Sequence, residues 1–158
     1  MDDFRITAIR DSIGVNYEET HALLNSLSAD DMQRRAANGW TVAQLAGHVA
    51  VSPSSAMFVL TRLRRGANAT VPGFLSWVPA LRNWFIVRKY NNASITSMIK
   101  TAADARDELL AWIGTVEEAE LAQAGEVFGS GRKTLGEFLD YILEHGREHR
   151  AEITAALA

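Results

Sequence analysis

Four long stretches of this sequence place apolar residues at steps of three and four, the spacing that lines one face of an α-helix. These stretches predict helices over residues 2–27, 41–65, 94–113 and 134–153. No segment alternates convincingly as a β-strand would, and residues 125–131 are interpreted as a glycine-rich loop. Four amphipathic segments without strands indicate an all-α fold, an antiparallel four-helix bundle.

Signals for helix ends support these boundaries. Thr41 and Ser94 are predicted N-caps of the second and third helices, and Thr134 with Glu137 has the pattern of a capping box at the start of the fourth. Pro53 lies inside the second helical pattern, where a proline removes one backbone hydrogen bond. We therefore expect either a kink in this helix or two shorter helices.

The composition suits a single domain over residues 1–158. Of the 158 residues, 47% are hydrophobic, which is enough to bury a core without cross-links. The formal net charge of −3 comes from interspersed acids and bases, so neither nucleic acid nor a membrane surface is an expected partner. There are no cysteines, so any thiol chemistry needs an external thiol. The N-terminus has no apolar signal sequence, and a cytoplasmic location is expected.

The connection between the second and third helices is apolar and rich in tryptophan. Residues 71–90 contain Trp77 and Trp84, and the apolar run is broken by Pro79 and Arg82. Because a membrane-spanning helix needs about 20 mostly apolar residues, a transmembrane segment is not expected here. The segment is interpreted instead as a pocket wall, a lid or the surface of a homodimer.

Three histidines lie where helices would bring them together. His145 and His149 are four residues apart, so both imidazoles would project from one face of the fourth helix. They continue the apolar stripe of that helix, and His48 continues the stripe of the second, so all three are expected to face the interior. One divalent ion bound by three neutral rings would satisfy them and leave a coordination position open. The alternative is that each histidine is an ordinary core or surface residue.

His21 is the fourth histidine and lies near the inward face of the first helix. It is a further candidate, as a ligand or as a base beside the site, with a surface position as the alternative. The histidine pair lacks both the Glu-x-x-His spacing of di-iron bundles and the His-Glu-x-x-His spacing of zinc peptidases, so a mononuclear site is predicted. Three histidines suit zinc, nickel, iron or copper, so spacing alone does not select the metal.

Two segments of the chain resemble the DinB-like superfamily. They are residues 39–48, GWTVAQLAGH, and residues 134–149, TLGEFLDYILEHGREH, and the likeness extends over nearly the whole chain. Members of this superfamily, which include thiol-dependent maleylpyruvate isomerases and thiol S-transferases, are four-helix bundles with a three-histidine site for a divalent metal, usually zinc or nickel. The resemblance implies His48, His145 and His149 as the metal ligands.

The leading hypothesis for function is a divalent-metal-dependent enzyme acting on a small molecule, as a low-molecular-weight-thiol S-transferase, an isomerase or a hydrolase. The metal would activate water or an incoming thiol, and the resemblance implies a thiol cosubstrate such as mycothiol or bacillithiol. Trp77 and Trp84 are candidates for an apolar substrate wall. Arg82 or Arg88 is a candidate for binding a substrate carboxylate.

Two alternatives stay open. In the first, the chain is a non-enzymatic dimeric protein that binds a hydrophobic ligand or a partner, with a structural or vacant metal site. In the second, the site has been lost and only the bundle remains. Departures from the family pattern at Pro53, at Gly146 and around the tryptophan-rich segment leave the shape of the pocket and the substrate open.

Overall fold

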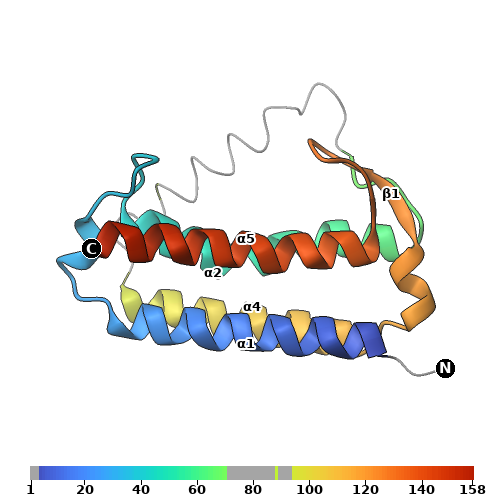
Figure 1. Cartoon of the computed structure of the whole chain (residues 1–158), viewed down its shortest axis with the longest axis horizontal. Helices are drawn as coiled ribbons and strands as arrows, with labels where there is room; N and C mark the ends of the chain where they lie inside the picture. Colours follow the sequence, from blue (N-terminus) through green and yellow to red (C-terminus); the bar gives the residue numbers. More distant parts are fainter. Residues whose placement is uncertain (1–3, 71–87, 89–93) are drawn as a thin grey trace.

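The computed structural model describes residues 4–70, 88 and 94–158. Within this part of the chain four long helices form a bundle (Figure 1): α1 (Phe4–Ser26), α2 (Val42–Arg64), α4 (Ile95–Ile113) and α5 (Leu135–Leu157). The described connections contain two short 3₁₀ helices, η1 (Asp31–Gln33) and η3 (Glu118–Ala122). The predicted all-α fold and helical bundle are confirmed. Among the described helices, none is long and apolar enough to cross a membrane.

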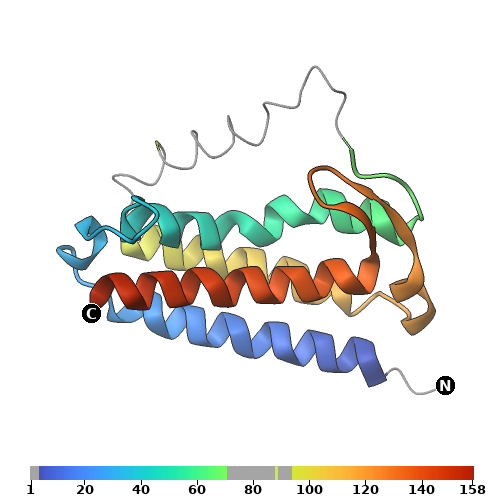
Figure 2. The same cartoon turned by 45° about the horizontal axis from the view of Figure 1, so that its top comes forward.

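The four helices do not all alternate in direction. Helix α1 packs against α4 and α5, and α2 packs against the same two helices. Helices α2 and α4 run the same way, while α1 and α5 both run the opposite way (Figure 1, Figure 2). Accordingly, Arg64 at the end of α2 donates a hydrogen bond of 2.8 Å to the hydroxyl of Thr115, just after α4. The antiparallel arrangement predicted from the sequence is therefore wrong for the pair α2 and α4 and for the pair α1 and α5.

The length of the chain between α2 and α4 explains this difference. Helix α2 has 23 residues and so a length of about 35 Å. Residues 65–94 provide enough chain to lead back to the end of the bundle where α2 begins. Bundles that contain parallel neighbours need long crossover connections of this kind, whereas short connections join antiparallel neighbours.

Side-chain caps start the helices where the sequence predicts them. Thr41 accepts a hydrogen bond from the backbone N–H of Gln44 and forms a capping box with it at the start of α2. Thr134 and Glu137 form the predicted capping box of α5. Ser94 caps α4 by accepting a backbone hydrogen bond with its side chain. Because each cap satisfies N–H groups that have no partner inside the helix, these positions define where the helices begin.

Helix α2 continues without a break through Pro53, which is buried. The alternative of two shorter helices is therefore wrong. An interior proline costs a helix about 3 kcal/mol, because it removes one hydrogen bond and crowds the preceding turn. Packing of α2 against α4 and α5 offsets this cost, and the neighbouring Ser52 adds a hydrogen bond of 2.8 Å from its hydroxyl to the carbonyl oxygen of His48.

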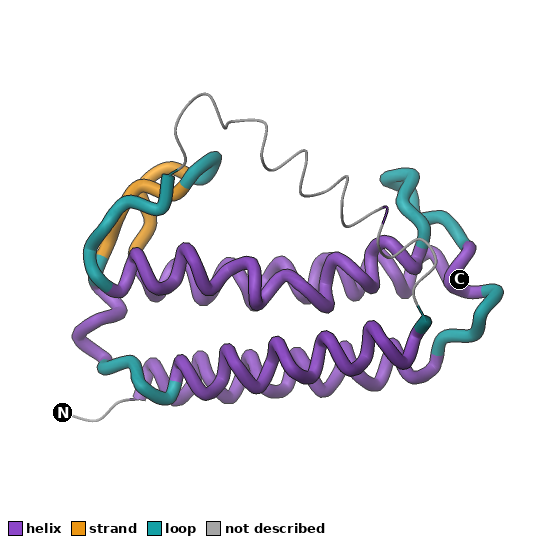
Figure 3. Tube along the Cα trace, turned by 180° about the vertical axis from the view of Figure 1, so that it is seen from behind, coloured by secondary structure: helices purple, strands orange, loops and turns teal. Residues whose placement is uncertain are grey.

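A hairpin takes the place of the loop predicted for residues 125–131. Strand β1 (Ala124–Val127) pairs antiparallel with β2 (Gly131–Thr134), in register along all four residues of each strand (Figure 3). Gly125 permits a close backbone contact, because an added Cβ there would lie 2.4 Å from the carbonyl oxygen of Ala67. The loop prediction holds for residues 128–130, which form the turn, and is wrong for residues 125–127 and 131. Strands this short, with glycines among their residues, have no alternating apolar pattern.

Two clusters of buried side chains fill the bundle. One contains Tyr17 and Phe138, and the other contains Leu24 and Ile153. Along α5 the buried apolar residues stop at Ile142 and resume only at Ile153. The stretch of α5 between these two positions carries both of its histidines, so they lie between the two clusters.

Gly146 lies at a close contact between α5 and α1. A Cβ added at Gly146 would lie 2.5 Å from Nδ2 of Asn16, which is shorter than any van der Waals contact. Asn16 is only 5% exposed, and its side-chain oxygen accepts a hydrogen bond from Arg150, so it is not free to move aside. The close packing of the two helices thus accounts for a glycine between the two histidines.

We expect Gly146→Ala to lower the free energy of unfolding by about 1–3 kcal/mol, because overpacking outweighs the better helix propensity of alanine. Gly14 is the matched control, since it lies in α1 and an added Cβ there has no atom within 4 Å. Gly14→Ala should raise the free energy of unfolding by about 0.5–1 kcal/mol. Denaturant unfolding followed by circular dichroism measures both changes. Equal stabilisation of the two variants would contradict this explanation of Gly146.

Candidate metal centre

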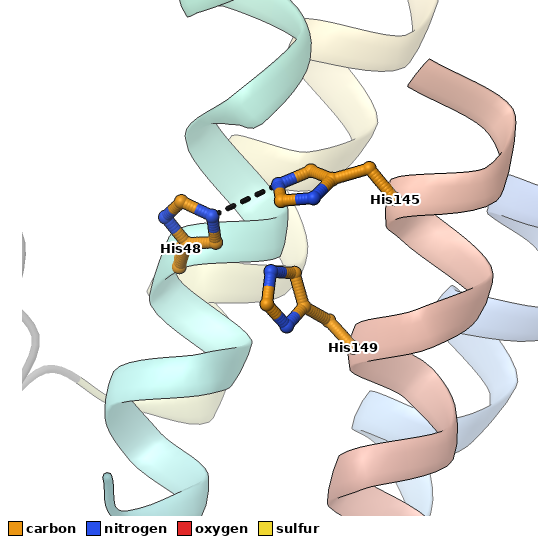
Figure 4. A group of neighbouring side chains, drawn as sticks. All are labelled: His48, His145 and His149. Carbon is orange, nitrogen blue, oxygen red and sulfur yellow. Dashed lines mark hydrogen bonds between the residues drawn. The ribbon is translucent and has the colours of Figure 1, made fainter. Parts of the chain in front are cut away.

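Three histidines converge between α2 and α5 (Figure 4). His48 comes from α2, and His145 and His149 come from successive turns of α5. One ring nitrogen of each lies within 4.8 Å of a ring nitrogen of both others. The structure therefore brings together the three residues that the sequence pattern selects as candidate ligands.

The spacing of the rings fits one shared ion. Nε2 of His48 lies 3.0 Å from Nε2 of His145. Two nitrogens bound to one ion at about 2.0–2.1 Å lie roughly 3.0–3.4 Å apart. The ring centroid of His149 is 4.9 Å from that of His48 and 4.4 Å from that of His145. All three imidazoles are thus close enough to contribute to one mononuclear site.

Glu152 orients His149. Nδ1 of His149 lies 2.7 Å from Oε2 of Glu152, and Asn38 donates a hydrogen bond of 3.4 Å to the same oxygen. Because a carboxylate only accepts, Nδ1 of His149 donates its proton in this contact, so in a neutral ring Nε2 carries the lone pair. This Nε2 is buried and makes no hydrogen bond to the residues that the structure describes. A histidine that binds a metal ion almost always donates its other ring N–H to a carboxylate, a carbonyl or water, and His149 has this arrangement.

Aromatic neighbours hold the other two rings. The ring of Trp40 meets that of His48 edge-on, with centroids 5.7 Å apart, and His48 is only 7% exposed. Tyr141 stacks on His145, with ring centroids 5.5 Å apart and ring planes inclined by 20°. These contacts restrict the rotation of both imidazoles, which keeps the ring nitrogens of the cluster near one another.

A cavity of about 450 Å³ opens beside the cluster, and His48 and His145 form part of its wall. Residues of α1, α2, α5 and the hairpin line it, and none of the described lining residues is an aspartate, glutamate, lysine or arginine. Exposed aromatic rings of Phe58, Phe128 and Tyr141 are among them. A cavity of this size and lining suits a small, mainly apolar molecule.

Three polar residues near the cluster were not predicted as site residues from the sequence. Asn16 and Tyr17 of α1 line the cavity, and burial raises the pKa of the Tyr17 hydroxyl above its usual range, so this hydroxyl stays protonated at physiological pH. Glu152 contacts His149. The sequence pattern that could have identified Glu152 is its position three residues after His149, because side chains at this spacing lie together on a helix. The pattern that could have identified Asn16 is that it is a polar residue on the apolar stripe of α1.

The remaining candidates do not join the cluster. His21 lies outside it, on α1, where Nδ2 of Asn25 is 3.1 Å from one of its ring nitrogens. Arg88 is exposed and is not among the described residues that line the cavity. The predictions for Trp77, Trp84 and Arg82 lie outside the described residues, as does most of the tryptophan-rich connection.

The fold and the cluster together define a helical-bundle protein with a candidate metal centre. A sequence profile of the DinB superfamily matches residues 14–153, a range that includes all three histidines. The chain therefore belongs to the DinB superfamily, which is typically metal-binding. A search of curated proteins found no match to this chain. This membership confirms the resemblance to the DinB-like superfamily found in the sequence, but it does not specify a reaction for this protein.

We expect Glu152→Gln to weaken zinc binding about 10- to 100-fold, because a neutral amide supports the histidine less well than a carboxylate. A zinc titration against a chromogenic chelator measures the affinity. Glu148→Gln is the matched control, since Glu148 is an exposed residue of the same helix. Equal zinc affinities of the two variants would remove Glu152 from the site.

Proposed function

We propose that this protein is a divalent-metal-dependent enzyme in which His48, His145 and His149 hold the ion. The surroundings of the two ring nitrogens of His149 are the observation that carries the proposal. Its Nδ1 donates to Glu152, and its buried Nε2 has no hydrogen-bond partner among the described residues. Burial without a partner costs a polar group free energy, so this nitrogen favours a ligand that accepts its lone pair.

Zinc or nickel is the metal we propose, in line with the family resemblance. A divalent ion bound by three neutral imidazoles keeps a coordination position open and lowers the pKa of a water or thiol bound there. The chain's own residues supply the surroundings. Trp40 and Tyr141 hold the rings of His48 and His145, and the cavity brings a small molecule next to both histidines.

The reaction we propose is the transfer of a low-molecular-weight thiol to an apolar small molecule, with isomerisation or hydrolysis as the other reactions open to such a site. In the transfer, the thiol gives up its proton to solvent, its sulfur forms a C–S bond to an electrophilic carbon of the substrate, and the bond from that carbon to a leaving group breaks. The chain has no cysteine, so the reacting sulfur would belong to an external thiol such as mycothiol or bacillithiol. The apolar wall of the cavity supports the choice of an apolar second substrate.

The aromatic side chains at the cavity favour a second candidate function, the binding of an apolar ligand without catalysis. Phe58 is 54% exposed and Phe128 is 39% exposed, and both line the cavity. Exposed apolar rings around a cavity are common in proteins that bind hydrophobic molecules. In this case the metal would be structural or absent, and thiol-transfer assays with either thiol would detect no turnover.

Protein purified without an affinity tag or a chelator should contain about one divalent ion per chain, as a mononuclear site requires. The double variant His145→Ala/His149→Ala should contain none, because it keeps only one of the three proposed ligands. Elemental mass spectrometry measures the metal, and circular dichroism checks that the variant is still helical. His21→Ala is the control, since His21 lies outside the cluster, and it should keep its metal.

Two results would contradict the proposal. One is a full complement of metal in the folded double variant, which would place the ion elsewhere. The other is a wild-type protein that takes up neither zinc nor nickel on reconstitution, which would favour the ligand-binding function instead.

A further inference from the structure

Asn16 is a buried polar residue in the wall of the cavity. It lies on α1, is only 5% exposed, and lines the cavity together with His145 and Gly146 of α5. Most polar side chains this deeply buried use all of their hydrogen-bonding groups. Asn16 uses its side-chain oxygen, which accepts a hydrogen bond from Nη1 of Arg150.

This hydrogen bond determines which way the amide group faces. A guanidinium only donates, so Oδ1 of Asn16 must face Arg150 and Nδ2 must occupy the other position. Nδ2 then points toward Gly146, since a Cβ added at that glycine would lie 2.5 Å from it. Within the described ranges, Nδ2 of Asn16 makes no hydrogen bond. The amide therefore presents an unused donor at a cavity wall that Gly146 also forms.

The donor is held rigidly. Arg150 also donates to the backbone oxygen of Asn16 at 3.2 Å, and its other terminal nitrogen pairs with Glu19 at 2.6 Å. A side chain tied in this way loses little conformational entropy when a ligand binds. The positive charge of Arg150 on the carbonyl side of the amide also polarises it, which strengthens the hydrogen bond that Nδ2 can donate.

The cavity restricts the acceptor that Asn16 would meet. No charged Asp, Glu, Lys or Arg side chain is among its described lining residues, so a neutral oxygen is favoured over a free carboxylate. The exposed rings of Phe58 and Tyr141 suit the apolar remainder of a ligand. Gly146 directly follows His145, so an acceptor that meets Asn16 lies close to the histidine cluster.

We propose that Nδ2 of Asn16 donates a hydrogen bond to a carbonyl oxygen of an apolar small molecule bound in this cavity. Asn16 thereby selects carbonyl compounds and places them beside the three histidines. Its significance for catalysis rests on the proposed metal-dependent function. The hydrogen bond itself needs no metal.

Two probes of nearly the same shape test this contact, acetophenone and α-methylstyrene, in which a methylene group replaces the carbonyl oxygen. Binding is measured by NMR titration, with protein as purified and after metal removal. Asn16→Asp keeps the size of the side chain and a partner for Arg150 but removes the N–H donor. It should weaken acetophenone binding about fivefold to tenfold more than α-methylstyrene binding.

The side-chain amide resonance of Asn16 supplies a readout that a purely structural role would not move. It is assigned by its loss in Asn16→Asp. Its N–H signal should shift further downfield with acetophenone than with α-methylstyrene, because both probes bring an aromatic ring but only acetophenone accepts a hydrogen bond. Asn25→Asp is the matched control, because Asn25 is an exposed residue of the same helix, and it should leave the affinity for both probes unchanged.

The outcomes separate this inference from the proposed function. Dependence of acetophenone binding on Asn16 in a protein that binds no metal would support the contact and overturn only the metal-dependent activity. In a protein that does bind metal, two results would overturn the contact alone: equal weakening of the binding of both probes, or the same shift of the amide resonance with both probes. Failure of acetophenone to bind at millimolar concentration would also overturn it.

Discussion

The contact between α1 and α5 at Gly146 is the constraint on which the geometry of the candidate site depends. The missing side chain lets Asn16 approach the backbone of α5, and Arg150, one turn further along α5, binds both Asn16 and Glu19 of α1. His145 directly precedes Gly146, so the distance between α1 and α5 also determines how far its ring reaches toward α2. Helix packing and site geometry therefore cannot vary independently in this region.

The histidine cluster also changes the energetics of the bundle. Two of its three histidines lie on α5 between two clusters of buried apolar side chains, where further apolar residues would have continued the core. Nε2 of His149 is buried and has no hydrogen-bond partner in the described part of the chain, and such a nitrogen costs about 1–3 kcal/mol. An ion that binds there only in the folded state removes this cost and adds its own binding free energy to stability. Metal binding and folding are thus expected to be linked in this protein.

Those features that depend on residues close in sequence could be predicted. The helices follow from long apolar stripes, and their starts follow from local side-chain caps such as Thr41 and Thr134. The pairing of His145 and His149 was predictable because they are one helical turn apart, and His48 was predicted to join them from its place on the apolar stripe of the second helix and from the family resemblance. Other features that depend on distant contacts could not be predicted from the sequence. The hairpin is held partly by backbone hydrogen bonds to Ala69, and the direction of α4 depends on a long connection rather than on its own residues. The role of Asn16 depends on which face of α5 meets α1, which no local pattern specifies.

Thr134 joins the hairpin to the helix that carries two of the histidines. It is the last residue of β2 and the N-cap of α5, so no linker separates the sheet from the helix. The angular position of every side chain on α5 is therefore set relative to the hairpin. One residue inserted between Thr134 and His145 would rotate the rest of α5 by about 100° and turn both histidines away from α2. Extra residues in the turn at 128–130 would leave this rotation unchanged. Changes in chain length at the tip of the hairpin are consequently compatible with the orientation of the two histidines, whereas changes in the first turns of α5 are not.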